Sequence, residues 1–152
     1  MKRFIIALLC LAMLLSLCGC KAKPVAEKYC DSLAEAEKLI GFKIDTPESL
    51  SDSKTKTFRA GGRTLEICYF DGKVLKGRIS KADNLENING LDYGYTYKTE
   101  TAMGGTDYTL RSAEANGTIH LAEWTKGKYS YMVLLSDCKT VDEMIAFCKT
   151  IN

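Results

Sequence analysis

Turn dipeptides recur at nearly regular intervals through the chain from about Pro47 onward. They are Gly61-Gly62, Asp71-Gly72, Gly104-Gly105, Asn116-Gly117 and Lys126-Gly127. The runs between them are rich in β-branched and aromatic residues, and such runs separated by short glycine turns are typical of β-hairpins. The spacing therefore predicts an antiparallel β-meander that extends as far as the C-terminal segment.

Apolar residues occupy every second position in several of these runs. Leu65, Ile67 and Tyr69 are one such set, and a second set lies near the end of the chain: Tyr129, Tyr131, Val133 and Leu135. Side chains at alternate positions of a strand share one face, so the pattern predicts a sheet with one packed face and one wet face. The stretch from Asp83 to Gly90 breaks the alternation and leaves room for a helical turn.

Two amphipathic helices are expected on either side of the strands. Tyr29, Leu33, Ala36 and Ile40 have helical spacing in the first, which a Ser32 to Glu35 capping box begins and Gly41 ends. The second begins with a capping box at Thr140 and Glu143 and carries an apolar stripe made of Val141, Met144, Ile145, Cys148 and Ile151. We therefore predict an α+β fold of two layers, in which both helices cover the apolar face of the sheet.

The N-terminus has the features of a secretory signal. Lys2 and Arg3 precede an apolar stretch from Phe4 to Leu17, which as a helix would extend only about 20 Å against a hydrocarbon core of about 30 Å. The following Leu17-Cys18-Gly19-Cys20 resembles the lipobox of bacterial lipoproteins. The resemblance implies that residues 1–19 are removed and that Cys20 receives a diacylglyceryl group, which anchors the chain in a membrane. The alternatives are a plain signal peptide cut at another small residue and a buried hydrophobic helix.

The expected mature chain begins with a short polar tether, residues 20–27, followed by one domain over residues 28–152. Loss of Lys2 and Arg3 leaves 19 basic residues, which equals the number of acidic ones. A neutral, exported chain lacks the excess of positive charge that binds nucleic acid, so we exclude nucleic acid as a partner. About 130 residues suffice for one hydrophobic core but not for two.

Four of the seven cysteines would remain after processing, because Cys10 and Cys18 leave with the signal and Cys20 takes the lipid. They are Cys30, Cys68, Cys138 and Cys148. An exported domain with four cysteines permits two disulfides in three connectivities, and a bond from Cys138 to Cys148 is one candidate. The alternative is that they stay small buried hydrophobic groups. No C-x-x-C pair is present, so neither a metal site nor a cofactor is predicted.

Few residues point to catalysis. His120 is the only histidine, and strand alternation predicts that it shares a face with Ala122 and Trp124. No nucleophile motif accompanies it, so we interpret it as structural. Two carboxylates from Glu66, Asp71 and Glu123 facing one site would suit glycoside hydrolysis, which makes a small cell-envelope hydrolase the alternative function.

Tyr93, Tyr95 and Tyr97 are spaced at every second position. On a strand they would form an aromatic surface for a peptide, glycan or lipid headgroup. The alternative, which we favour, is that they form the packed face of the sheet beneath the helices.

The domain resembles an uncharacterised family of lipoprotein-associated domains of Gram-positive bacteria. The matching features are the segment Gly41 to Pro47, the meander, an Ala122-Glu123-Trp124 strand paired with Tyr129-Ser130-Tyr131, and the helix beginning at Thr140. The resemblance brings no catalytic residues. We therefore expect a lipid-anchored, non-enzymatic binding module on the outer face of a cell membrane, whose partner is an envelope protein, a peptide or a glycan.

Overall fold

The computed structural model describes residues 26–83, 88, 94–95, 97–115 and 117–152, apart from the side chain of Cys138. The predicted signal segment, the lipobox with Cys20 and most of the tether lie outside these ranges, as does most of the stretch from Asp83 to Gly90. Within the described ranges, no helix is long and apolar enough to cross a membrane.

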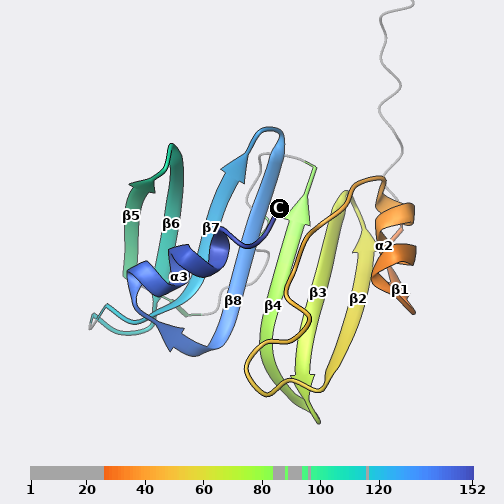
Figure 1. Cartoon of the computed structure of the whole chain (residues 1–152), viewed down its shortest axis with the longest axis horizontal. Helices are drawn as coiled ribbons and strands as arrows, with labels where there is room; N and C mark the ends of the chain where they lie inside the picture. The colour runs from red at the N-terminus through yellow and green to blue at the C-terminus, as the bar shows by residue number, and fades with distance from the viewer. Residues whose placement is uncertain (1–25, 84–87, 89–93, 96, 116) are drawn as a thin grey trace, which may run out of the picture.

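The described chain forms one antiparallel sheet of eight strands together with two helices (Figure 1). The strands are β1 (Lys28–Cys30), β2 (Thr55–Gly61), β3 (Thr64–Asp71), β4 (Val74–Ala82), β5 (Tyr97–Met103), β6 (Thr106–Ser112), β7 (Ile119–Lys126) and β8 (Tyr129–Lys139). The helices are α2 (Leu33–Ile40) and α3 (Val141–Cys148). The prediction of an antiparallel sheet within an α+β fold is confirmed.

The strand order differs from that of a single meander. The order across the sheet is β1-β2-β3-β4-β8-β7-β6-β5, so two four-stranded meanders meet where β4 pairs with β8. All five predicted turns join consecutive strands inside one meander or the other. β4 lies in the middle of the sheet and β5 at its far edge, so these two consecutive strands are not paired as a hairpin.

One face of the sheet carries the core. Leu65, Ile67 and Ile79 of the first meander lie on the same face as Ala122 and Val133 of the second, and all are fully buried. Both alternating sets predicted from the sequence lie on this apolar face, which confirms the prediction of a packed face. The irregular segment 41–54 adds further core residues, namely Phe42, Ile44 and Leu50.

The N-terminal helix has the predicted bounds, with Ser32 as its N-cap and Gly41 as its C-cap, but the predicted apolar stripe begins only at Leu33. Tyr29 belongs to β1 and is exposed rather than lying on the helix. Ser32 Oγ accepts a hydrogen bond from the Glu35 N–H (3.2 Å), but the Glu35 carboxylate accepts from the N–H of Asp31 (3.0 Å) instead of that of Ser32. α2 lies beside β1, β2 and β3 at one end of the sheet.

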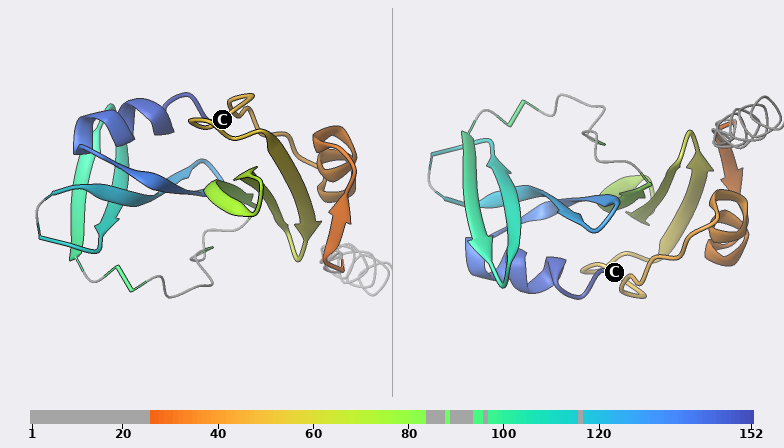
Figure 2. Two further views of the ribbon diagram at one scale, coloured as in Figure 1. Left: turned by 90° about the horizontal axis from the view of Figure 1, so that it is seen from below. Right: turned by 90° about the horizontal axis from the view of Figure 1, so that it is seen from above.

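The C-terminal helix has the predicted capping box, in which the Thr140 side chain and the Glu143 carboxylate each accept a backbone N–H. Met144, Ile145 and Cys148 are buried where α3 contacts β7 and β8. Beyond the helix Ile151 is also buried, and the N–H of Asp45 donates to the carbonyl of Asn152 (2.9 Å). In Figures 1 and 2, α3 and the segment 41–54 lie on the same side of the sheet.

The predicted disulfide is not formed. Cys30, Cys68 and Cys148 are free thiols, which excludes the Cys138 to Cys148 bond in this structure. Cys148 points from α3 into the core, whereas Cys68 lies on the opposite face of β3 beside Glu66. Cys30 lies on the short strand at the sheet edge. The described thiols project from separate elements, and Cys30 and Cys148 fill space as small buried groups.

Candidate functional site

The second face of the sheet, called the polar face below, carries rows of side chains that run across the strands. Strand register places one row in the order Arg59, Glu66, Ser80, Met132, Glu123 and Thr109, from β2 to β6. Leu121, Met132 and Leu134 form a small apolar cluster at the centre of this face, and Ile88 and Tyr95 pack against it. The polar residues are thereby divided into two groups, one on each side of the cluster.

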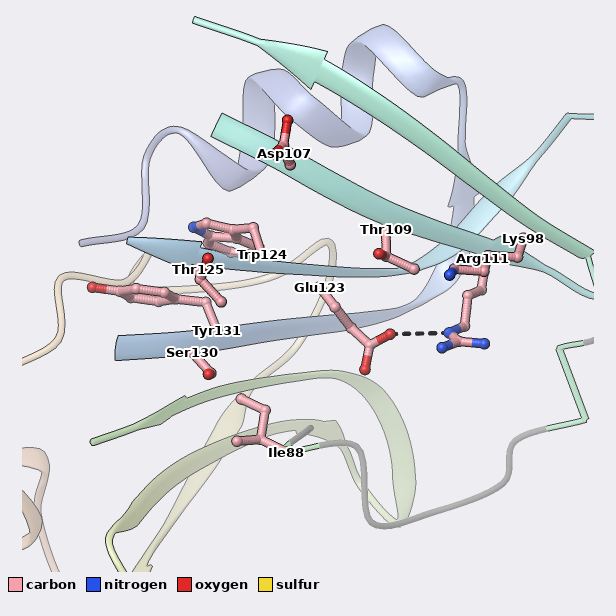
Figure 3. Close-up of a pocket in the computed structure, with 10 residues that line it drawn as sticks. All are labelled: Ile88, Lys98, Asp107, Thr109, Arg111, Glu123, Trp124, Thr125, Ser130 and Tyr131. Atoms are coloured by element: carbon pink, nitrogen blue, oxygen red, sulfur yellow. Dashed lines mark hydrogen bonds and ion pairs between the residues drawn. The ribbon is translucent and has the colours of Figure 1, made fainter. Parts of the chain in front are cut away.

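A cavity of about 360 Å³ lies over the β5 to β8 half of the sheet (Figure 3). Its polar lining consists of Lys98, Asp107, Thr109, Arg111, Glu123, Thr125 and Ser130. Arg111 Nε donates to Glu123 Oε2 (3.0 Å), and this is a diagonal pair between adjacent strands. In Figure 3 the Glu123 carboxylate extends toward Ile88, while the Trp124 ring points to the opposite side of the strand. The cavity therefore offers an ion pair and three hydroxyl groups to a ligand.

His120 takes no part in this cavity. Its Nδ1 lies 3.2 Å from the carbonyl oxygen of Leu135, and its ring stacks on Tyr95 with centroids 5.5 Å apart. The prediction that His120 shares a face with Ala122 and Trp124 was wrong, because a register shift between Ile119 and Leu121 interrupts the alternation. A structural role fits these contacts.

The carboxylates that a glycoside hydrolase would need are not assembled at one point. Glu66 and Glu123 share a row but lie three strands apart, about 14 Å between backbones at the usual strand spacing. Paired catalytic carboxyl groups lie about 5 to 9.5 Å apart. Glu66 is paired with Arg59 and Arg78, and Asp71 is paired with Lys54 (2.8 Å) at the end of β3. This geometry gives the hydrolase alternative no support.

The three tyrosines have separate surroundings. Tyr93 lies outside the described residues. Tyr95 precedes β5 and packs against the apolar cluster of the polar face, where burial raises the pKa of its hydroxyl. Tyr97 is the first residue of β5 and is about half exposed. Tyr95 and Tyr97 thus do not form one strand face, and their binding of a ligand stays a prediction.

Lys81 is a buried cation that the sequence pattern did not single out. It lies on the apolar face, where its Nζ donates to the carbonyl of Lys43 (2.6 Å). The same Nζ lies 4.5 Å, 5.1 Å and 5.8 Å from the ring centroids of Tyr129, Tyr131 and Phe42. Burial lowers the pKa of Lys81, and the nearby Asp45 carboxylate opposes that shift. The alternation of Ile79 with position 81 was the only signal that placed this lysine in the core.

The chemistry of the polar face has to be inferred from its own residues. Within the described part of the chain, no group of three or more His, Cys, Asp and Glu side chains could hold a metal ion. Comparisons with models of protein families, with curated proteins and with solved structures gave no match. The groups available for binding a ligand are therefore the hydrogen-bond donors, acceptors and charges around the ion pair of Arg111 and Glu123.

Proposed function

We propose that this protein is a lipid-anchored, extracytoplasmic binding module that holds a peptide or glycan on its polar face. The observation that carries the proposal is the cavity over β5 to β8, whose lining combines charges of both signs with three hydroxyl groups. Such a lining can satisfy the hydroxyl groups of a sugar or the amides of a peptide. The Leu17 to Cys20 motif supports the anchor, which would be a diacylglyceryl group on Cys20.

A non-enzymatic role agrees with the arrangement of this cavity. The Glu123 carboxylate forms an ion pair with Arg111. In this proposal Glu123 holds the Arg111 guanidinium in position and does not accept a proton from a substrate. Nucleophilic catalysis would need a hydroxyl or thiol beside a base, and His120 is engaged with Tyr95 and Leu135 instead.

Among the described residues, we infer that the polar face is also the one broad face of the sheet left for a ligand. In this proposal α2, α3 and the segment 41–54 together form a second layer over the apolar face. The burial of Met144, Ile145, Phe42 and Leu50 supports it. A ligand would then approach from the side that bears Glu123 and Arg111.

The test combines anchoring with binding. In the host cell, Cys20→Ser should abolish labelling of the protein by a fatty acid, and label retained in the variant would refute the anchor. For binding, the full chain in detergent micelles is titrated with cell-wall glycan fragments and short peptides while backbone amide NMR signals are followed. Shifts should concentrate at Thr109, Glu123 and Ser130.

Arg111→Ala should weaken that binding by about tenfold or more, because a hydrogen bond from a charged group contributes about 1.5 to 3 kcal/mol. Lys73→Ala, at the turn between β3 and β4, is the matched control. Shifts confined to other surfaces would contradict the site, and appearance of hydrolysis products would favour the small cell-envelope hydrolase.

A further inference from the structure

A second cavity, of about 430 Å³, lies on the polar face over β2, β3 and β4, on the other side of the central apolar cluster. Its lining includes Arg59, Thr64, Glu66, Arg78 and Ser80. It shares only Ile88 with the cavity over β5 to β8. The groups that line it are a different set, so its ligand need not be the same.

Two linked ion pairs, both made by Glu66, form the floor of this cavity. The Glu66 carboxylate bridges two guanidinium groups, with 3.1 Å from Oε1 to Arg59 Nη2 and 3.1 Å from Oε2 to Arg78 Nη1. The side chains of Glu66 and Arg78 are only 13% and 9% exposed. One buried carboxylate thus faces two guanidinium groups, and because both of its oxygens are engaged it adds little repulsion toward a further anion.

Arg59 has a second carboxylate partner, Glu27, which lies outside the strands of the sheet. Glu27 Oε2 lies 3.2 Å from Arg59 Nη1, and the Glu27 side chain is 68% exposed. Residues 26–27 cross directly over Gly61, where an added Cβ would lie 2.4 Å from Glu27 Cα. Exposed ion pairs of this kind contribute little to stability, so the Glu27 carboxylate can be exchanged for another at small cost.

Ser80 provides an independent indication of a ligand. It is 1% exposed, lies opposite Glu66 in the strand register and lines the cavity. Its Oγ has no hydrogen-bond partner among the described residues. A buried hydroxyl without a partner is costly, and such groups in folded proteins call for an explanation such as a missing binding partner.

We propose that this cavity is a binding site for a small organic carboxylate, which displaces Glu27 from Arg59 and accepts a hydrogen bond from Ser80 Oγ. Arg59 supplies the charge-assisted contact, and Arg78 adds positive potential from the buried side. The acid would be either a free small molecule or the C-terminal end of a peptide. The site is independent of the Cys20 anchor and of the cavity over β5 to β8.

The experiment titrates the full chain in detergent micelles with three probes: acetate, N-acetyl-diglycine and the C-terminal amide of N-acetyl-diglycine. Amide NMR signals of Gly62 and Ser80 report on the site. Both acids should shift these signals and the amide should not. Equal affinity for the two acids would identify a free small acid, and tighter binding of N-acetyl-diglycine would identify a peptide end.

Two variants and a control complete the test. Ser80→Ala should weaken acid binding by about three- to tenfold, the loss expected for one hydrogen bond. Glu27→Gln should tighten it by up to about fivefold, because the competing carboxylate is removed. Thr125→Ala, in the other cavity, should leave it unchanged. Equal binding of acid and amide, or a Glu27→Gln variant that binds the acids more weakly, would overturn the proposal.

Discussion

Lys81 shows how a single residue fixes a segment that has no regular structure. Its ammonium joins the carbonyl of Lys43 to the rings of Tyr129 and Tyr131, and it thereby ties the start of the segment 41–54 to the sheet. A buried charge is costly unless it is compensated, and here a carbonyl and three aromatic faces provide the compensation.

Lys81→Ala should therefore lower the free energy of unfolding by about 1.5 to 3 kcal/mol, because it removes a hydrogen bond from a charged group together with its ring contacts. Urea denaturation measures the effect. Lys73→Ala, at an exposed turn, should stay within about 0.5 kcal/mol of the parent. Equal midpoints for the two variants would show that the Lys81 contacts do not stabilise the fold.

The buried thiol of Cys148 should make the protein less stable as the pH rises into the alkaline range. Burial raises its pKa from 9.0 to about 12. Between these values the unfolded chain releases the proton while the folded chain keeps it, so the unfolded state binds fewer protons and stability falls as the pH rises. The loss begins near pH 9 and amounts to at most about a tenfold lower folding constant per pH unit for this one group.

Cys148→Val removes the titrating group, so its stability should fall less steeply than that of the parent between pH 9 and 11. Urea midpoints at several pH values give the two slopes. Cys68 and the buried tyrosines, whose pKa values are also raised, contribute the same slope to both proteins. Identical slopes would mean that the Cys148 thiol is not protected by the fold.

At the scale of the element, α3 illustrates why a short helix forms at the end of the chain. An isolated helix of eight residues is marginal in water, so local signals alone do not hold it. The capping box at Thr140 and Glu143 defines its start, whereas the contacts of its apolar residues with β7 and β8 keep it in place.

Met144→Ala should cost about 2 to 5 kcal/mol, since Met144 is fully buried and its truncation leaves a cavity against the sheet. Thermal unfolding followed by circular dichroism measures the change. Asp142→Ala, an exposed substitution on the same helix, is the control and should have a small effect. A Met144→Ala variant as stable as this control would show that α3 does not pack on the core.

For the whole molecule, the seam between β4 and β8 is the decisive feature. Pairing runs from Gly77 and Leu135 to Ala82 and Ser130, and it joins two meanders that each have local hairpin connections. One continuous core crosses the seam, because Ile67 and Ile79 belong to the same buried cluster as Val133 and Ala122.

We therefore expect the two meanders to unfold as one unit. Fluorescence of Trp124, the only tryptophan, reports on the second meander, and far-ultraviolet circular dichroism reports on both. The two urea transitions should coincide, as they do for two-state domains of this size. Transitions with separate midpoints would mean that the seam contributes little to the cooperativity.

Local features of the chain were sufficient to predict most of its elements, although not the short strand β1. The glycine turns predicted the hairpins, the alternation at Leu65, Ile67 and Tyr69 predicted the packed face, and Ser32 and Thr140 marked both helix starts. These features act between residues a few positions apart, where backbone conformation and side-chain period dominate. The sequence likewise carries the lipobox resemblance at Cys20.

Tertiary structure alone decided how the elements and side chains meet. Pairing of β4 with β8, the approach of Leu50 to Gly77 and the burial of Lys81 all join residues far apart in sequence, and no local pattern encodes such contacts. The same holds for the polar face, where register across the strands aligned Arg59, Glu66 and Ser80 in one cavity and Arg111 with Glu123 in the other. The cysteine count permitted a disulfide, whereas Cys30, Cys68 and Cys148 are free thiols in the folded chain. Strand order is chosen by burial of the whole apolar face at once, and this is a property of the assembled sheet rather than of any segment.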